Sequence, residues 1–173
     1  MQQIILSGVG GQGVLFVTKL LAETALDLGC SVLISETHGM AQRGGNVISH
    51  LKISDGGSQN FISPLIRPGK ADVLLALHPD GFAAHGFFLK KGGNAFRNMP
   101  APEGANALDA TQVASDLGAP ISANLVLLGF SAARGGLFCG PEAIEATLKR
   151  FGGKRLEISL KALRAGWEAG KRA

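Results

Sequence analysis

The glycine-rich segment GVGGQGV, residues 8–14, is the part of the sequence best suited to hold an anion. It follows an apolar run, residues 3–7, that predicts a β-strand, and it precedes a segment with helical periodicity, residues 15–28. A strand, a glycine turn and a helix start gather backbone N–H groups that can face a negatively charged group. The arrangement therefore predicts an anion-binding loop.

The spacing of these glycines also fits the pattern G-x-G-x-x-G. In such loops one glycine permits the tight turn, one lets a ligand approach the backbone, and one lets the helix pack on the strand. The same pattern arises where the turn is needed only for close packing, so both interpretations stay open. The predicted ligand-facing or partner-facing residues are Gly8, Gly10, Gly11, Gln12 and Gly13.

A second segment, SETHGMAQRGGNVISH at residues 35–50, is polar and contains three glycines, which is typical of a loop that lines a surface or cleft. Arg43 offers a fork of donors to a phosphate or carboxylate, or it pairs with Glu36 or a helix end. The candidate cleft residues are Glu36, His38, Gln42, Arg43, Gly44 and Gly45, together with Asn124 in a later apolar segment.

The histidines of the sequence leave their roles open. His38 can transfer a proton, donate a hydrogen bond as a neutral ring, or be purely structural, and no metal-ligand spacing surrounds it. We therefore predict no metal site on this chain. The spacing of His50 and His78 does not decide between catalysis and structure either.

Glu36 directly follows an apolar run, residues 31–35. In a dinucleotide-binding unit an acidic residue at this point holds a ribose hydroxyl. A stand-alone Rossmann-type dinucleotide-binding protein is therefore the alternative function. The long polar loop after Glu36 argues against it, because the usual unit leads into another helix.

The predicted elements indicate an α/β protein with a three-layer, Rossmann-like sheet, mostly parallel, with helices on both faces and an edge hairpin. Residues 3–7 and 31–35, joined by a helix, predict a parallel pair with a right-handed crossover. Residues 47–53 alternate as a half-buried strand does, and residues 71–77 are apolar enough for a central strand. Residues 90–93 predict a turn.

Helices are predicted over residues 109–117, 122–133, from 141 to about 151, and 156–169. The first opens with Asp109 or Thr111 as its N-cap. The segment 122–133 is apolar nearly all round, so we expect it to be buried or to lie at an interface. A homodimer of the isolated chain through residues 123–133 is one consequence.

Composition excludes several classes of protein. The chain has 173 residues, of which 46% are hydrophobic and 17% charged, as expected for one globular domain rather than a disordered segment. No apolar run approaches a membrane span, and no signal peptide is recognisable. The two cysteines, Cys30 and Cys139, form no C-x-x-C pair, which favours a cytoplasmic location.

The net charge of +4 is concentrated near the C-terminus. From Lys149 onward there are eight Lys or Arg residues and two Glu residues. Trp167 is the only aromatic residue among the charges apart from Phe151, so the pattern does not favour nucleic acid. We predict a solvated helix face, with docking on an acidic partner as the alternative.

Four segments together resemble a known family: GVGGQGV, SETHGMAQRGGNVISH, ADVLLALHP and ISANLVLLG. They are similar to the gamma subunit or gamma domain of the 2-oxoacid:ferredoxin oxidoreductases, over roughly residues 3–165. The stretch HGMAQRGG favours the indolepyruvate or arylpyruvate branch, in which this domain is a separate beta subunit. The resemblance implies a single pyruvate/ketoisovalerate oxidoreductase gamma-type catalytic domain, residues 1–173.

The resemblance implies that the whole enzyme oxidatively decarboxylates a 2-oxoacid on thiamine diphosphate and magnesium. Electrons pass through iron–sulfur clusters to ferredoxin, and an acyl-CoA is released. This sequence has neither a cysteine framework for a cluster nor the usual thiamine diphosphate motif, so these cofactors belong on a catalytic partner subunit. The chain is then an accessory subunit, inactive alone, with no nucleic-acid or membrane partner.

The glycine loop and Arg43 are the expected contact with that partner or with coenzyme A. An exposed helix start contributes only about 0.3–1 kcal/mol to binding an anion, so contacts from Arg43 are needed as well. A pure scaffold, in which the loop touches only the backbone of the partner, is the remaining alternative.

Overall fold

The computed structural model describes residues 1–38, 45–55 and 63–172, with the side chain of His38 excepted. Within these ranges the chain forms an α/β fold with a six-stranded sheet. Its elements are β1 (Gln2–Val9), α1 (Val14–Asp27), β2 (Ser31–His38), β3 (Asn46–Ser54), β4 (Ala71–Ala76), α2 (Gly81–His85), η1 (Gly86–Phe88), β5 (Leu89–Asn98), β6 (Ala107–Leu108), α3 (Ala110–Asp116), η2 (Pro120–Ser122), α4 (Ala123–Ala133), α5 (Pro141–Phe151) and α6 (Leu156–Arg172).

The strand order is β2-β3-β1-β4-β5-β6. β1, β4, β5 and β6 are parallel, whereas β3 is antiparallel to both of its neighbours, β1 and β2. This confirms the mostly parallel α/β sheet with an antiparallel pair at one edge. The C-terminal ends of β1, β4 and β5 therefore lie at the same edge of the sheet.

The prediction that the strands at residues 3–7 and 31–35 are neighbours was wrong. They run in the same direction, but β3 lies between them, with Leu51 opposite both Ile4 and Ile34. Burial explains the order, because Leu51 is fully buried whereas Ile34 is 38% exposed. The more apolar strand takes the inner position and the more polar one takes the edge.

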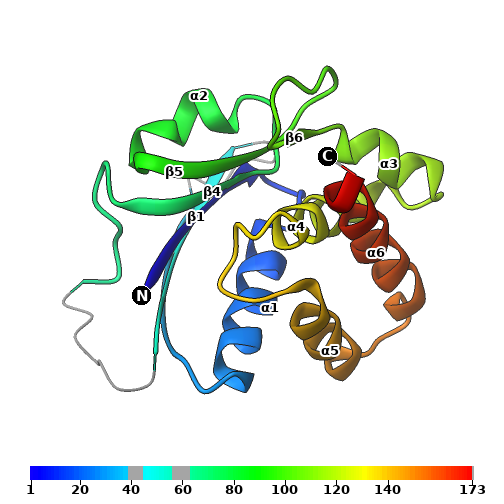
Figure 1. Ribbon diagram of the computed structural model, residues 1–173, viewed down its shortest axis with the longest axis horizontal. Helices are drawn as coiled ribbons and strands as arrows, with labels where there is room; N and C mark the ends of the chain where they lie inside the picture. Colours follow the sequence, from blue (N-terminus) through cyan, green and yellow to red (C-terminus); the bar gives the residue numbers. More distant parts are fainter. Residues whose placement is uncertain (39–44, 56–62, 173) are drawn as a thin grey trace.

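The helices α1, α4, α5 and α6 cover one face of the sheet, as Figure 1 shows. Their apolar side chains form the main core with Ile4, Leu6, Val73 and Leu75 of the central strands. As expected, α4 is buried over most of its length, but it is buried by α6 of the same chain. The apolar surface at residues 123–133 is therefore not available for a homodimer.

Glycines allow α4 and α6 to approach closely. A Cβ atom added to Gly166 of α6 would lie 1.8 Å from the carbonyl oxygen of Val126 in α4. A Cβ atom on Gly129 of α4 would lie 2.0 Å from the carbonyl oxygen of Leu163 in α6. Because backbone atoms fill this space, the two helices can cross at this distance only without side chains there.

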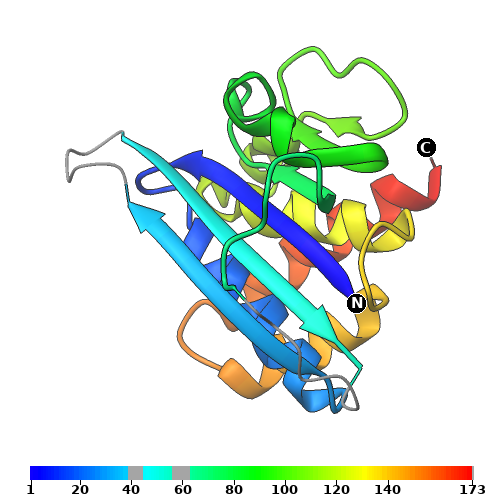
Figure 2. The same cartoon turned by 90° about the vertical axis from the view of Figure 1, so that its left-hand side faces the viewer.

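The other face of the sheet is covered less completely. A small cluster of Ile5, Ile66, Ala71, Leu74 and Ala76 lies there, packed under residues 63–70, α2 and η1. In Figure 2, which looks onto this face, residues 63–70 cross the sheet and no described helix lies over β2 and β3. Helices therefore flank both faces, but very unequally.

The structure confirms the predicted cap of α3, but not the turn predicted at residues 90–93. Asp109 caps α3 as expected, because its carboxylate accepts the N–H of Gln112 at 2.8 Å. The turn predicted at residues 90–93 is instead part of β5, where the pairing register with β4 shifts between Ala71 and Val73. Gly92, with φ of +79°, accommodates this irregularity. The short helix α2 was not predicted.

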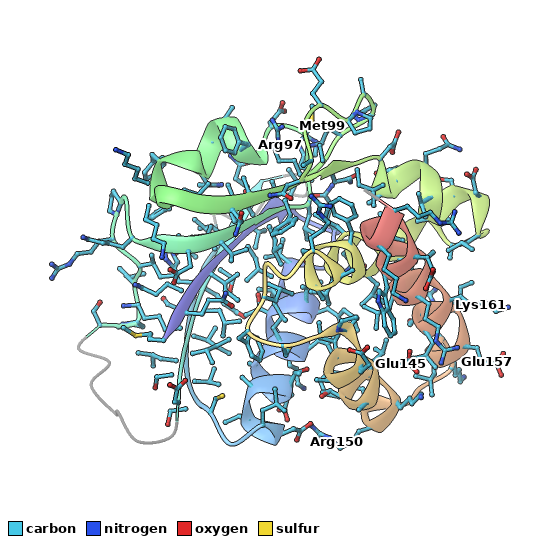
Figure 3. All side chains as sticks on the ribbon, viewed as in Figure 1. Arg97, Met99, Glu145, Arg150, Glu157 and Lys161 are labelled. Atoms are coloured by element: carbon cyan, nitrogen blue, oxygen red, sulfur yellow. The ribbon has the colours of Figure 1, made fainter. Side chains whose placement is uncertain are left out.

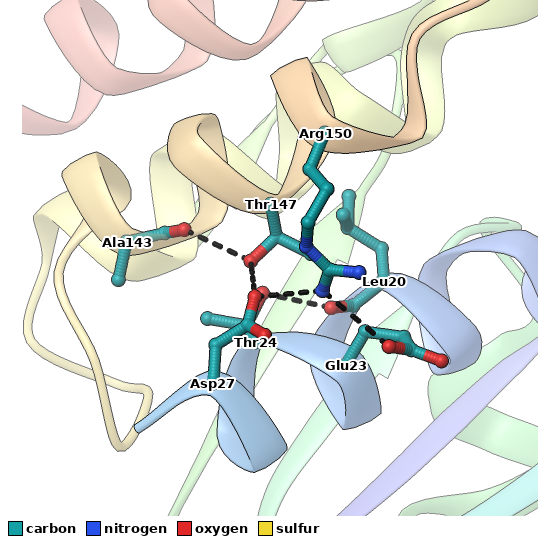
Figure 4. A network of polar contacts seen from close by, with 7 residues as sticks. All are labelled: Leu20, Glu23, Thr24, Asp27, Ala143, Thr147 and Arg150. Atoms are coloured by element: carbon teal, nitrogen blue, oxygen red, sulfur yellow. Dashed lines mark hydrogen bonds and ion pairs between the residues drawn. The ribbon is translucent and has the colours of Figure 1, made fainter. Parts of the chain in front are cut away.

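Ion pairs on both sides hold α5 in place. On the α1 side, Arg150 donates to Asp27 at 2.7 Å and Thr147 donates to the same carboxylate at 3.1 Å (Figure 4). On the α6 side, Arg164 donates to both oxygens of Glu145, at 2.8 and 2.6 Å. Figure 3 shows Glu145 on the side of α5 that faces α6. Much of the basic charge near the C-terminus is therefore solvated charge paired within the chain.

The Glu145 network predicts an acid-sensitive contact between α5 and α6. The hydrogen bonds from Arg164 and Lys149 lower the pKa of Glu145 from its ordinary 4.5 to about 2. Because the folded-state pKa is depressed, this contribution to stability is fully present above pH 4.5 and is lost as the pH falls towards 2. Urea unfolding at several pH values should show a weaker acid dependence between pH 4.5 and 2 for Glu145→Gln than for the wild type. Glu157→Gln, on the exposed side of α6, should keep the wild-type slope, and equal slopes for all three proteins would contradict the prediction.

Two searches complete the description. No helix in the described residues is long and apolar enough to cross a membrane. Among the same residues, no group of three or more His, Cys, Asp or Glu side chains is placed to hold a metal ion.

Candidate ligand-binding cleft

The glycine loop lies where β1 ends and α1 begins. Its conformation is fixed by Gln12, whose side-chain oxygen accepts the N–H of Val9 at 2.9 Å and whose amide nitrogen donates to the carbonyl of Leu77 at 3.3 Å. The N–H of Gln12 also donates to the carbonyl of Val9 at 3.1 Å. Gln12 therefore ties the loop to the end of β4 instead of facing a ligand freely.

The glycines of the loop have different tasks. Gly8 lies in β1, and a Cβ there would lie 2.8 Å from both the side-chain oxygen of Gln12 and a methyl carbon of Val14, so it is required for packing. Gly11 and Gly13 have φ of +96° and +76°, which disfavour other residues. A Cβ on Gly13 would also lie 2.4 Å from Nδ2 of Asn124. Gly8 and Gly13 are thus both needed for close packing within the chain.

Several N–H groups of the loop remain available. In the described part of the chain, the N–H groups of Gly11 and Gly13 form no hydrogen bond, and those of the first turn of α1 have no helical acceptor. These groups lie together at the positive end of a 14-residue helix. The loop therefore retains the donor geometry that an anion requires.

Two adjacent cavities open beside the loop. The larger has a volume of about 410 Å³ and lies between Gly11, Gly13, the start of α4 and the loop after α5. The smaller, of about 170 Å³, lies between the loop, Leu77 at the end of β4 and Asn98 at the end of β5. Gly11 and Asn124 line both. We call the two cavities together the glycine-loop cleft.

One wall of the larger cavity is aromatic. The rings of Phe16 and Phe151 meet edge to face, with centroids 6.4 Å apart. Lys19 and Arg150 place their cationic groups 5.7 and 5.9 Å from the centroid of the Phe151 ring. Phe16 remains 39% exposed, so this wall presents an apolar surface to a bound group.

Sequence analysis missed a pair of cations in the cleft. Lys154 and Arg155, which follow Gly152 and Gly153 in the connection from α5 to α6, line the larger cavity opposite the glycine loop. The signal was in the sequence, because a glycine pair beside cations is the same combination that made Arg43 a candidate. The prediction for these two cations was instead a solvated basic face of the C-terminal segment.

The structure brings only some of the predicted residues together. The N–H of Gly10 donates to the carbonyl of Gly45 at 3.0 Å, so the end of the second polar segment contacts the glycine loop. Asn124 also reaches the loop, as expected of a cleft residue. Gln42, Arg43 and Gly44 lie outside the described residues, as does the side chain of His38.

Glu36 is not placed as a dinucleotide-binding unit requires. It lies within β2, opposite Ser49 of β3, and Ser49 is in turn opposite Leu6 of β1. Two strand spacings, about 10 Å, therefore separate Glu36 from β1. Because β3 intervenes, Glu36 cannot hold the ribose of a dinucleotide lying on the glycine loop, and the main reason for the alternative function is removed.

The histidines are dispersed. His78 follows β4 and its Nδ1 accepts the N–H of Asp80 at 3.3 Å, within a local turn. His50 and His85 lie on the opposite face of the sheet from α1, and burial lowers the pKa of both rings. The structure therefore assigns neither His50 nor His78 to the glycine-loop cleft.

Comparison with known proteins identifies the fold and the family. The model for the family "Pyruvate ferredoxin/flavodoxin oxidoreductase" matches residues 3–169. Indolepyruvate oxidoreductase subunit IorB of Archaeoglobus fulgidus is 31% identical, over 95% of this chain and 92% of that protein. The keto/oxoacid ferredoxin oxidoreductase gamma subunit of Geobacter sulfurreducens superposes over the full length of both chains, with 29% identity and a TM-score of 0.79.

The same fold also occurs inside a larger chain. The 2-oxoglutarate:ferredoxin oxidoreductase of Magnetococcus marinus, solved with 2-oxoglutarate, coenzyme A and succinyl-CoA, matches with a TM-score of 0.79 and 18% identity over 31% of its length. At this identity the likeness concerns the fold alone. The family model, by contrast, matches sequence from the first strand to the last helix. The chain therefore belongs to the pyruvate ferredoxin/flavodoxin oxidoreductase family.

Proposed function

We propose that this chain is the accessory subunit of a thiamine-dependent 2-oxoacid:ferredoxin oxidoreductase of the indolepyruvate or arylpyruvate branch. The whole enzyme would decarboxylate its 2-oxoacid oxidatively, reduce ferredoxin and release an acyl-CoA. The observation that carries the proposal is the near full-length match to a protein named as an indolepyruvate oxidoreductase subunit. Because the reaction uses ferredoxin and coenzyme A, we propose a cytoplasmic location.

The thiamine diphosphate, magnesium and iron–sulfur clusters would be held by a catalytic partner subunit. The chemistry of the side chains in the glycine-loop cleft supports this division, since its lining consists of glycines, amide and hydroxyl side chains, apolar and aromatic side chains and two cations. Such groups bind and orient anions and flat rings, but they are not the carboxylates and thiolates that magnesium and iron–sulfur clusters need.

We further propose that the cleft holds the anionic part of coenzyme A. Gly11 and Gly13, whose N–H groups form no hydrogen bond with the described residues, line the larger cavity, and so do Lys154 and Arg155. Phosphate groups would sit between them, and the exposed ring of Phe16 would pack on a flat group such as adenine. Arg43 remains a candidate from the sequence for a further phosphate contact.

Co-expression tests the proposed function. The chain would be produced with the thiamine-containing catalytic subunit from the same source, and the purified material assayed for 2-oxoacid-dependent reduction of ferredoxin. We expect a stable heteromer that is active with indolepyruvate or another arylpyruvate, and no activity from this chain alone. Failure to associate, or turnover by the isolated chain, would contradict the proposal.

The coenzyme A role predicts a selective kinetic effect. In the assembled enzyme, the double variant Lys154→Ala/Arg155→Ala should raise the Michaelis constant for coenzyme A at least about tenfold, because charge-assisted hydrogen bonds to phosphate are lost. The turnover number at saturating coenzyme A should change little. Lys161→Ala, an exposed cation of α6, is the matched control and should behave as the wild type. An unchanged constant in the double variant would leave the scaffold alternative.

A further inference from the structure

A second concave site lies on the other face of the sheet, away from α1, α4, α5 and α6. It has a volume of about 520 Å³ and lies between β2, β3, residues 65–68 and the end of α2 with η1. Figure 2 shows the backbone of this face, with residues 63–70 crossing the sheet. We call it the β3 groove. Its lining residues are Thr37, Ile48, His50, Leu65, Ile66, Arg67, Pro68, His85, Phe87 and Phe88.

The groove exposes large apolar side chains. Phe87 is 58% exposed and Leu65 is 49% exposed, and both lie at its border. The ring centroids of Phe87 and Phe88 lie 4.4 Å apart, with the ring planes tilted by 31°, so one wall of the groove is aromatic. Exposed apolar surface gathered in one concavity is typical of a site that another molecule covers.

A buried polar group points into the same groove. His50 is only 4% exposed, and its Nδ1 accepts the N–H of Ile66 at 3.1 Å. The neutral ring therefore carries its proton on Nε2, and no hydrogen bond joins Nε2 to a described residue. Burial lowers the pKa of His50, so the ring stays neutral and its Nε2–H remains a donor near pH 7.

Two cations stand beside this donor without a carboxylate. Arg67 lines the groove, and no described acidic side chain forms an ion pair with it. Among the described residues, the amino group of Lys52, on the same side of β3 as His50, donates to the carbonyl of Ser63 at 2.8 Å and to no carboxylate. Burial and the nearby charge of Arg67 lower the pKa of Lys52. The groove thus combines apolar walls with an excess of positive charge and a spare N–H donor.

We propose that the β3 groove is a docking site for the catalytic partner subunit, and that it binds a segment presenting an apolar side chain next to a carboxylate. The inference rests on the proposed function, because it needs that partner. The apolar group would lie against Phe87 and Leu65, and the carboxylate would reach Arg67 and Nε2–H of His50. A second copy of this chain is the poorer occupant, since an isologous dimer would bring the cations of two grooves together.

Binding measurements between the purified subunits test this inference. We expect Phe87→Asp and Arg67→Glu each to raise the Kd for the catalytic subunit at least tenfold, with thermal unfolding midpoints close to that of the wild type. Leu26→Asp, at a 53% exposed site on α1, and Lys161→Glu on α6 are the matched controls, and each should change the Kd less than twofold. Hydrogen exchange should show protection of residues 63–70 and 86–88 on complex formation.

The outcomes separate this inference from the function on which it rests. Wild-type affinity in both groove variants, with the wild-type chains still binding one another, would overturn the groove assignment and leave the accessory-subunit role standing. An equal loss of affinity in the control variants would also overturn the groove assignment. A homodimer of the isolated chain that Phe87→Asp dissociates would overturn it as well. If the wild-type chain does not bind the catalytic subunit at all, the proposed function fails first.

Discussion

The Gly166→Ala variant is expected to lose about 3 kcal/mol or more of folding free energy, because its new methyl group would overlap the backbone of α4. The added Cβ would lie 1.8 Å from the carbonyl oxygen of Val126 and 3.0 Å from the backbone nitrogen of Phe130. Backbone atoms cannot rotate away as a side chain can, so the two helices would have to separate. Their buried apolar contact would then be weakened along its length.

Steric overlap and helix propensity predict opposite changes in the folding free energy of Gly166→Ala, so a measurement distinguishes them. Alanine is about 1 kcal/mol more favourable than glycine inside a helix, so helix propensity alone predicts that Gly166→Ala stabilises the protein. Urea unfolding at neutral pH measures the difference. Gly129→Ala, whose Cβ would lie 2.0 Å from the carbonyl oxygen of Leu163, should behave similarly, whereas Lys161→Ala should stay within about 0.5 kcal/mol of the wild type. A stable Gly166→Ala protein would show that the helices are not this close.

Gly13→Ala is expected to lose about 2–3 kcal/mol, for two separate reasons. A left-handed conformation costs an ordinary L-residue about 1–2 kcal/mol, and Gly13 has φ of +76°. The new Cβ would also lie 2.4 Å from Nδ2 of Asn124, which forces that side chain away from the glycine-loop cleft. The assembled enzyme should therefore also bind coenzyme A more weakly, because the loop and Asn124 line the same cavity.

The neighbouring glycine provides the control for this variant. Gly11 has φ of +96°, but a Cβ there meets no atom within 4 Å, so Gly11→Ala carries the conformational cost alone. The loss in Gly13→Ala should exceed it, and Asn124→Ala combined with Gly13→Ala should remove the excess. Double-mutant analysis of urea unfolding gives this coupling directly. Equal losses in the two single variants would show that Asn124 does not restrict the loop.

The elements of the fold were predictable where periodicity or caps mark them, and their order in the sheet was not. The alternation of residues 47–53 identified both the strand β3 and its faces, and Asp109 identified the start of α3. Nothing local in the sequence says that β3 lies between β1 and β2, because that choice depends on which strand buries more surface. The inclusion of Gly92 and Gly93 in β5 was missed for a similar reason, since pairing with β4 overrides the turn tendency of glycine.

The residues of the glycine-loop cleft also fall into those that the sequence identified and those that only the fold brings there. The sequence identified the glycine loop from its local spacing and Asn124 as a cleft candidate, but it did not predict that the two are neighbours. Lys154 and Arg155 reach the cleft only because α5 packs against α1 and α6 packs against α4, which no short pattern in the sequence records. Gln12 shows the opposite case, because the sequence suggested a ligand contact while the structure uses its amide to join the loop to Leu77.

The position of β1 at the centre of the sheet has a consequence for synthesis of the protein. β1 is synthesised before both of its neighbours in the sheet, Asn46–Ser54 and Ala71–Ala76. Until residue 76 has emerged, the nascent chain carries an apolar strand with at least one edge unpaired. A ribosome that stalls before β4 would therefore release a chain prone to aggregation, and chaperones that shield such strands would matter most during this interval.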